Sequence, residues 1–422
     1  MGLLNPVTTV LPLRDSLQGR DRSGLFSATA TGPVRYREED GLEGYWAEGG
    51  TTNLFTNPTA GVVTTGWGAG ANRTLTRETS LPGPLPDGLA TIVTTGFLVV
   101  ADQDFASGAD ILSCNVTLNS AAHSAAFYVW IPSVWTGGQL ALQANDFAGV
   151  GGTTSINLDM STRDQWQRVR LENWTPASGD LAGRVVLRCT ASPGFLSGQY
   201  VYIAANQLEQ KPYTTSYCPL LDPLTGNPLP GYSWAGTPHY SASVRAATVL
   251  TFDPAGRVDN DSFAMAGRFS LDSITDRWQA IASAGKQDIG NFFGVFNRDD
   301  GRFSAKSNGG YAEDSLTFTP GSPQITYAAG QDTDWVAQLD ENDVIAETRG
   351  DGGAWSNNYV YVGSSNNGDY LNGSVGPVAF YDRPLTDVEL DKVKAAISLG
   401  RNPWGLLAPK KQYSFFQLRP GV

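Results

Sequence analysis

The chain has 422 residues, of which 41% are hydrophobic, so it is long enough to form two or three domains with separate cores. Its formal net charge of −12 argues against a duplex nucleic acid as a partner, because such a partner needs Lys and Arg side chains facing its phosphates. No apolar run approaches the ~20 residues of a membrane-spanning helix, so we expect no membrane insertion.

The 48 glycines, the 24 prolines and the 11% of aromatic residues favour an all-β fold of many short strands joined by tight turns. Residues 1–52 are broken repeatedly by Pro and Gly, and they sustain no amphipathic period. Their apolar side chains are too numerous for a disordered tail. We therefore expect an irregular N-terminal arm that docks on a neighbouring subunit or on the next domain. The N-terminus lacks the pattern of a signal peptide, so we expect synthesis in a cytoplasm.

Residues 53–218 contain apolar runs with period-2 alternation, separated by clusters of Gly, Pro, Asn and Ser. The runs include AAFYVWI, QWQRVRL, RVVLRCT and QYVYIAANQLE. Such alternation is typical of antiparallel sheets with one buried face, so we expect a first β-sandwich. Cys114 and Cys189 lie within strand-like runs, and Cys218 follows them. We interpret all three as buried thiols, although a disulfide stays open as an alternative.

Residues 219–245 begin with LLDPLTGNPLPG, whose prolines and glycines prevent regular structure from continuing through it. Because proline also limits flexibility, we expect a semi-rigid connector. Residues 246–400 are expected to form a second antiparallel sandwich. There FAMAGRFSL alternates between apolar and smaller or polar residues, and Asp300-Gly301 is a pair suited to the turn of a hairpin.

One helix is predicted over residues 387–398. Thr386 and Glu389 have the spacing of a capping box, and Leu385 and Leu390 that of a hydrophobic staple. The buried stripe is expected to consist of Leu390, Val393 and Ile397. We expect this helix to close the open end of the second sandwich. Residues 401–422 follow as a tail rich in apolar side chains, which we expect to dock on this chain or on a partner.

The stretch around the connector resembles the joint found in minor tail and fibre-like proteins of tailed bacteriophages. The residues that carry this resemblance are Gln207, Leu208, Glu209, Tyr213, Tyr217, Trp234, Gly236, Thr237, His239, Ser241 and Ser243. The end of the second sandwich resembles that of LamG-type, concanavalin-like domains, at Gly363, Tyr370, Gly373, Val378, Phe380, Tyr381, Arg383, Leu385 and Glu389. The NPW motif at residues 402–404 resembles the tail of phage structural proteins, but Leu407 stands where that family usually has Phe.

The resemblance implies a carbohydrate-binding-module-like jelly roll at 53–218 and a LamG-type sandwich at 246–400. It further implies a virion structural protein of the minor tail, baseplate or fibre type, assembled in the host cytoplasm and displayed on the exterior of the tail or capsid. Its partners would be other virion proteins, copies of itself and host cell-surface glycans, to which it would adhere weakly and multivalently. We assign assembly or docking roles to Trp234, His239, Trp404, Phe415 and Phe416.

Three other functions stay open: a capsid decoration or head-fibre protein, a virion glycan hydrolase, and a free-standing lectin. Residues and motifs typical of catalysis are few, because the chain has only two histidines and no GxSxG, HExxH or phosphate-loop pattern. We therefore expect no enzymatic activity.

Sugar binding requires an exposed aromatic ring next to polar groups, because the C–H face of a pyranose stacks on such a ring. The aromatic candidates are Trp67, Trp135, Trp355, Tyr359 and Tyr370, with Trp130 and Trp174 of the first sandwich as further candidates. Loop carboxylates suit Ca²⁺, and the candidates for such a site are Asp299, Asp300 and Asp369. We expect no other cofactor.

Overall fold

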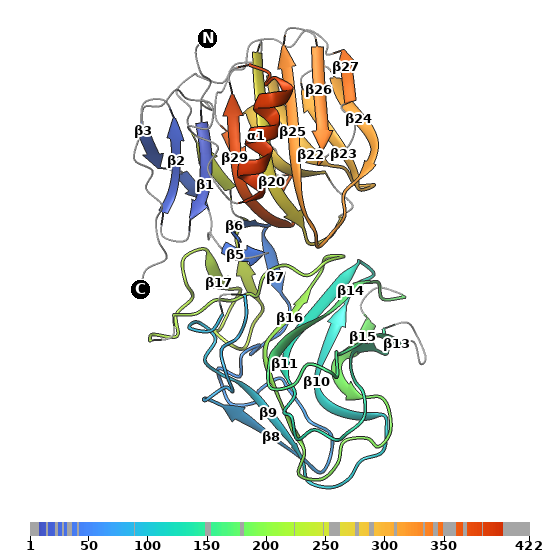
Figure 1. Ribbon diagram of the computed structural model, residues 1–422. Helices are drawn as coiled ribbons and strands as arrows, with labels where there is room; N and C mark the ends of the chain where they lie inside the picture. The colour runs from blue at the N-terminus through green and yellow to red at the C-terminus, as the bar shows by residue number, and fades with distance from the viewer. Residues whose placement is uncertain are drawn as a thin grey trace. The chain divides into compact units, whose positions relative to one another are not determined.

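The computed structural model of the protein describes the backbone of residues 8–399 with short gaps. These gaps are 14–15, 22–23, 28, 32–35, 40–41, 88, 148–152, 178–180, 223, 248, 253–261, 275–277, 287–290, 308–309, 332–333, 341–344, 349–359, 366–368 and 382. The chain forms two compact units, Gly50–Ala247 and Met1–Gly49 with Thr248–Val422. Both consist of antiparallel β-sheets, which confirms the expected tandem of β-sandwiches (Figure 1). No helix in the described part of the chain is long and apolar enough to cross a membrane.

The Gly50–Ala247 unit has two main sheets that enclose one core. The five-stranded sheet has the order β14 (Trp166–Trp174), β11 (His123–Trp130), β16 (Tyr200–Glu209), β9 (Gly96–Ala101) and β8 (Arg73–Glu78). The four-stranded sheet has the order β10 (Ala109–Leu118), β15 (Leu181–Cys189), β12 (Leu140–Asn145) and β13 (Thr153–Asn157). Alternate residues of both sheets, such as Phe127, Leu142 and Leu187, fill the space between them.

The stretch that we expected to be a separate connector folds into the Gly50–Ala247 unit. β17 (Tyr232–Trp234) and β18 (Ser243–Arg245) form a three-stranded sheet with β7 (Thr51–Asn53). Leu220 and Tyr232 are buried in a second apolar cluster of this unit. The prolines and glycines do prevent long elements, but burial of these apolar side chains holds the stretch against the sandwich.

Buried polar side chains also secure the start of this stretch. The Asn53 amide donates to the backbone oxygens of Asn206 (2.9 Å) and Cys218 (2.6 Å). The Glu209 carboxylate accepts from the backbone nitrogen and the hydroxyl of Thr215, each at 2.7 Å. Because each of these groups is buried, its hydrogen bonds offset a desolvation cost and specify one local arrangement.

The three cysteines are buried and form no disulfide, as the interpretation as buried thiols requires. Burial raises the pKa of the Cys114 and Cys218 thiols to about 12. Both are therefore neutral, poorly nucleophilic side chains at physiological pH.

The other unit contains a ten-stranded and a seven-stranded sheet. The first follows the path β27 (Ile345–Thr348), β26 (Asp334–Leu339), β25 (Pro323–Gln331), β20 (Ser262–Leu271), β29 (Gly373–Tyr381), β1 (Thr8–Leu13), β2 (Ser16–Asp21) and β3 (Gly24–Ser27), with β5 (Tyr36–Glu39) and β6 (Leu42–Ala47) joined through β29. The second follows β24 (Gly310–Thr317), β23 (Arg302–Ser307), β22 (Asn291–Asn297), β21 (Gln279–Lys286), β28 (Val360–Val362), β19 (Val249–Phe252) and β4 (Thr29–Thr31). The hairpin expected at Asp300-Gly301 joins β22 to β23.

The N-terminal segment differs from the irregular arm that we expected. Its backbone forms six strands between Thr8 and Ala47, of which β1 and β6 pair with β29 and β4 pairs with β19 (Figure 1). Proline and glycine keep these strands short, which hides them in the sequence. Their partners lie at the far end of the chain, so no local pattern shows the pairing.

Helix α1 (Asp387–Ser398) begins with the predicted capping box, because Thr386 and Glu389 exchange the expected hydrogen bonds. Leu390, Val393 and Ile397 are buried, as predicted. They pack with Ala264 and Ala266 of β20, whereas Phe263 and Met265 of the same strand face the core. The helix therefore covers the outer face of the ten-stranded sheet rather than closing an open end (Figure 1).

Candidate functional site

Three of the aromatic residues proposed for sugar binding are core residues: Trp67, Trp135 and Trp174. Trp174 is 5% exposed and packs on Phe147, with ring centroids 5.2 Å apart. The Trp67 ring is 7% exposed and packs on Phe55 and Phe97, with ring centroids 4.9 and 5.2 Å apart. The Trp135 ring is 4% exposed and stacks on Phe195 at 5.4 Å. None of these core rings presents a face to a ligand, because strand alternation and loop packing turn them toward the core.

The candidates Trp355, Tyr359 and Tyr370 lie in the other unit. Trp355 and Tyr359 fall outside the described residues, as do the docking candidates Trp404, Phe415 and Phe416. Tyr370 is half-buried, and its ring lies so close to Gly49 that a Cβ there would be 3.3 Å from the ring. Tyr370 therefore supports the backbone beside it, and a role in sugar binding stays a prediction.

The candidate calcium ligands do not form a metal-binding cluster with one another. Asp300 is exposed and pairs with Arg302 (3.3 Å) and Arg298 (3.7 Å), and Asp299 is exposed beside it. Asp369 accepts a hydrogen bond from the Ser365 hydroxyl at 3.0 Å. Within the described ranges, no group of three His, Cys, Asp or Glu side chains is placed to hold a metal ion. Calcium binding stays a prediction.

The outer face of the five-stranded sheet carries aromatic side chains from three adjacent strands. The register places Trp166 of β14 opposite Trp130 of β11, and Trp130 opposite Tyr202 of β16. Tyr200 lies two residues before Tyr202 and therefore shares its face. We call Trp130, Trp166, Tyr200 and Tyr202 the aromatic face. It lies opposite the core because Val201 and Ile203, the alternate residues of β16, are fully buried.

The rings of the aromatic face are held in place but not covered completely. Trp130 and Trp166 pack edge to face at 5.8 Å, and Tyr200 and Tyr202 do so at 5.6 Å. The Trp166 indole N–H donates to the Pro82 carbonyl at 2.9 Å. Trp166 is 8% exposed, whereas Trp130, Tyr200 and Tyr202 are half-buried.

A close approach of the 81–83 loop fixes the position of the Trp130 ring. Gly83 has a φ of +69°, and a Cβ there would be 3.0 Å from that ring. A glycine is therefore required at this position both for its backbone conformation and for the space it leaves. Together with the Trp166 hydrogen bond, this contact preorganises the aromatic face.

Polar groups border the half-buried rings. Leu98 of β9 lies opposite Tyr202, and the exposed Thr76 of β8 lies opposite Leu98. Burial, together with Tyr200 and the Glu78 carboxylate, raises the pKa of Tyr202, so its phenol stays neutral and can donate a hydrogen bond. Half-exposed rings next to a phenol, a hydroxyl and a carboxylate are the groups that stack on a pyranose and bind its hydroxyls.

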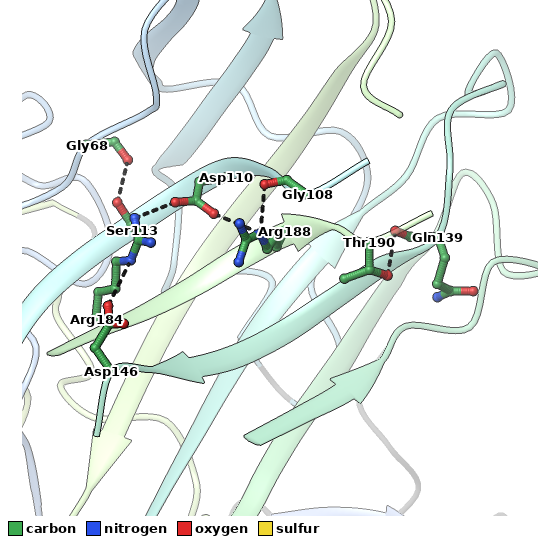
Figure 2. A network of polar contacts seen from close by, with 9 residues as sticks. All are labelled: Gly68, Gly108, Asp110, Ser113, Gln139, Asp146, Arg184, Arg188 and Thr190. Carbon is green, nitrogen blue, oxygen red and sulfur yellow. Dashed lines mark hydrogen bonds and ion pairs between the residues drawn. The ribbon is translucent and has the colours of Figure 1, made fainter. Parts of the chain in front are cut away.

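The outer face of the four-stranded sheet has a different chemistry, shown in Figure 2. Asp110 of β10 pairs with Arg184 and, at 3.1 Å, with Arg188 of β15. Arg184 also lies 3.6 Å from Asp146. We call this side of the sheet the polar face. Its positions on the paired strands are Asp110, Ser113, Asn115, Arg184, Val186, Arg188, Ala141, Gln143, Asn145, Thr153, Ser155 and Asn157. Four of them, Ala141, Gln143, Asn145 and Val186, are buried. These positions offer no aromatic ring, and their charged groups pair with one another and with Asp146. The side-chain oxygens of Gln143 and Asn145 are buried without a hydrogen-bond partner among the described residues.

Strand aromatics, rather than loop aromatics, form the better candidate site. Trp130 was among the sequence candidates. Trp166, Tyr200 and Tyr202 were not, because aromatic residues in polar loops were expected to be the exposed ones. The alternation of Tyr200 and Tyr202 with apolar residues was visible in QYVYIAANQLE. What the sequence did not show is which residues of β11 and β14 stand beside them.

No protein-family model matches this chain, and no curated protein matches it. Among solved structures, the tandem CBM22 domain of a Paenibacillus barcinonensis protein is 10% identical, with 80% of this chain and 99% of that chain covered and a TM-score of 0.29. A Trypanosoma rangeli sialidase is 12% identical, with 93% and 82% covered and a TM-score of 0.30. A Limulus polyphemus pentraxin is 15% identical, with 37% and 79% covered and a TM-score of 0.27. These TM-scores lie below 0.5, so the similarities carry no argument about the fold or the site of this chain.

Proposed function

We propose that this chain is a non-catalytic structural protein of a tailed-phage virion, of the minor tail, baseplate or fibre type. In this proposal it contributes to the assembly of the particle and adheres to host-surface glycans through the aromatic face. The virion role is supported by the motifs around 207–243 and at 402–404, which resemble those of phage structural proteins. The adhesive role is supported by one observation: Trp130 and Tyr202 lie in register on neighbouring strands, and these two rings and Tyr200 are only partly buried on the same face.

The adhesion requires no bond to be made or broken. A sugar ring stacks its C–H face on an aromatic side chain, while its hydroxyls exchange hydrogen bonds with Tyr202, Thr76 and Glu78. Neighbouring strands are ~4.8 Å apart, so the row from Trp130 to Leu98 matches a few consecutive sugar rings. A shallow site of this kind binds at about millimolar strength, and repetition around a symmetric particle raises the avidity by about two to four orders of magnitude.

The glycan part of the proposal is tested by retention on immobilised polysaccharide of the host. We expect Tyr202→Ala to reduce retention of the purified chain about tenfold, since the stacking surface is lost. The matched control is Tyr240→Ala, because Tyr240 is 54% exposed in the same unit and lies outside the aromatic face. Equal retention of the two variants, with equal melting temperatures, would contradict the proposal.

The virion part is tested separately by locating the chain in purified phage particles. Mass spectrometry should find it in stoichiometric amount, and labelling with an antibody should place it on the tail. Labelling on the head would support a capsid decoration or head-fibre protein instead. Absence from the particles, together with release of reducing sugars from host polysaccharide, would favour a glycan hydrolase.

A further inference from the structure

The Gly50–Ala247 unit contains a second concave site, away from the aromatic face. It is a cavity of about 180 Å³ whose wall includes Thr59, Arg77, Thr95, Leu221, Asp222 and His239. Arg77 lies between Thr76 and Glu78 on β8 and so points to the side of the sheet opposite Thr76. The cavity is smaller than the ~300 Å³ at which clefts for drug-sized ligands begin, so it suits a single small molecule.

The Arg77 guanidinium group is the cation of the cavity. It is held in place, and only some of its N–H donors form hydrogen bonds with described residues. The Nε atom of Arg77 donates to the Ala60 carbonyl at 2.7 Å, which orients the guanidinium group. Its two terminal nitrogens form no hydrogen bond with the described part of the protein. A guanidinium group oriented in this way presents two N–H donors side by side, which is the geometry that binds a carboxylate.

His239 lines the same cavity and is held by its neighbours. Its ring lies 4.8 Å from that of Trp234, and a Cβ at Gly61 would be 2.1 Å from its Cε1 atom. Burial, and then the charge of Arg77, lowers the pKa of His239, so the imidazole is neutral at physiological pH. Its Nδ1 atom is buried against Gly61 and has no hydrogen-bond partner among the described residues, so it is not open to the cavity. The imidazole therefore gives the cavity a neutral wall next to its cation.

Asp222 and the apolar wall restrict the kind of ligand. The Oδ1 atom of Asp222 accepts hydrogen bonds from the backbone nitrogens of Leu224 (2.8 Å) and Thr225 (3.3 Å), which fix the carboxylate. An inorganic anion would meet the repulsion of this carboxylate and would leave the wall of Ile92, Pro219 and Leu221 without a contact. A neutral sugar would leave the Arg77 guanidinium without a partner. A sugar acid matches every group, because its carboxylate, hydroxyls and C–H face have separate partners.

Strained backbone occurs at His239, which lines the cavity, and in the loop that contains the lining residues Thr59 and Gly61. Ala60, Val63 and His239 have φ values of 52°, 44° and 63°, which non-glycine residues rarely adopt. The Asn57 side chain holds the 57–65 loop in this shape, since it donates to the carbonyls of Val62 and Thr65. Strain of this kind persists where surrounding contacts over-determine it, and it gathers at binding sites.

We propose that this cavity binds a hexuronate, with its carboxylate on Arg77, its hydroxyls near Asp222 and its ring beside the imidazole of His239. The site goes beyond the adhesive role of the aromatic face and does not depend on it. If the ligand is a terminal sugar of a host glycan, the cavity adds selectivity for acidic glycans to the weaker stacking on the aromatic face.

The proposal is tested with the full chain and free D-glucuronate and D-galacturonate, by ligand-observed saturation-transfer NMR. We expect saturable binding of at least one uronate, and binding at least about tenfold weaker for D-glucose, since one charge-assisted pair is lost. Arg77→Gln should weaken uronate binding about tenfold or more. Arg170→Gln is the matched control, because Arg170 lies on β14, outside the cavity, and it should bind like the unaltered chain.

Loss of the Ala60 contact in Arg77→Gln could by itself disturb the loop, so a second variant is needed. His239→Asn removes the imidazole but keeps a residue that tolerates positive φ, and it should also weaken uronate binding several-fold. Tyr202→Ala should leave uronate binding unchanged, which separates this site from the aromatic face. Absence of uronate binding, equal binding of glucose, or unchanged affinity in both cavity variants would overturn the proposal.

Discussion

On the Gly50–Ala247 sandwich, the polar face pairs its charges internally, whereas the aromatic face leaves three rings half-exposed. Both faces arise from the same alternation of residues along antiparallel strands. On the polar face, Asp110 lies opposite Arg188 in the register and also pairs with Arg184. On the aromatic face, Trp130 lies opposite Tyr202, and both rings are only partly buried. A surface whose charges pair with one another stabilises the sheet, while one with partly open rings is suited to bind a ligand.

The largest effect should come from removing the open rings. Replacing Tyr200 and Tyr202 together by Ala should cost about 2 kcal/mol of binding free energy, which corresponds to about thirtyfold weaker retention on host polysaccharide. The control is Tyr202→Phe, which keeps the ring and loses only the hydroxyl, and it should lose no more than a few-fold. If the Phe and Ala variants behave alike, stacking is not the source of adhesion.

The polar face should respond in stability rather than in binding. Asp110→Asn removes the carboxylate that Arg184 and Arg188 share, and these Arg side chains are 36% and 30% exposed. After allowance for solvent screening, we expect the free energy of unfolding to fall by about 1 kcal/mol. Urea denaturation measures this change, and glycan retention should stay the same. A loss of retention at unchanged stability would move the binding site to the polar face and contradict the comparison.

Much of the architecture could be predicted from local patterns. Alternation in RVVLRCT and FAMAGRFSL predicted strands with one core face, and Thr386 with Glu389 predicted the start of helix α1. Local patterns failed where the partner is distant in the chain. The short strands before Ala47 are stabilised by pairing with β29 and β19, and the connector by packing on Tyr128 and Tyr217.

The candidate site could be predicted only in part for the same reason. Each aromatic residue was visible in the sequence, but its exposure depends on the loops that pack over it. Trp67 and Trp166 both have polar neighbours in the sequence and both are buried, yet Trp67 packs in the core between the sheets and Trp166 on the outer face. The register between β11, β14 and β16 decides which rings gather, and no segment contains that information alone.

The smallest effect, and a sharper distinction between the faces, should come from pH. Burial raises the pKa of Tyr202 above its usual value of about 10, so the neutral phenol is favoured in the folded chain. The stability that this shift contributes is present below that usual value and is lost as pH rises through the pKa of the folded state. We therefore expect glycan retention to stay constant from about pH 6 to 9 and to fall only at higher pH. A decrease between about pH 6 and 8 would instead implicate a histidine.

The most direct test of the aromatic face as the glycan-binding surface is hydrogen–deuterium exchange of the full chain with and without soluble host polysaccharide. We predict that the polysaccharide protects peptides from β9 and β16, Gly96–Ala101 and Tyr200–Glu209, and leaves those from β12 and β13 unchanged. Protection of β12, β13 and β15 without protection of β16 would contradict the account.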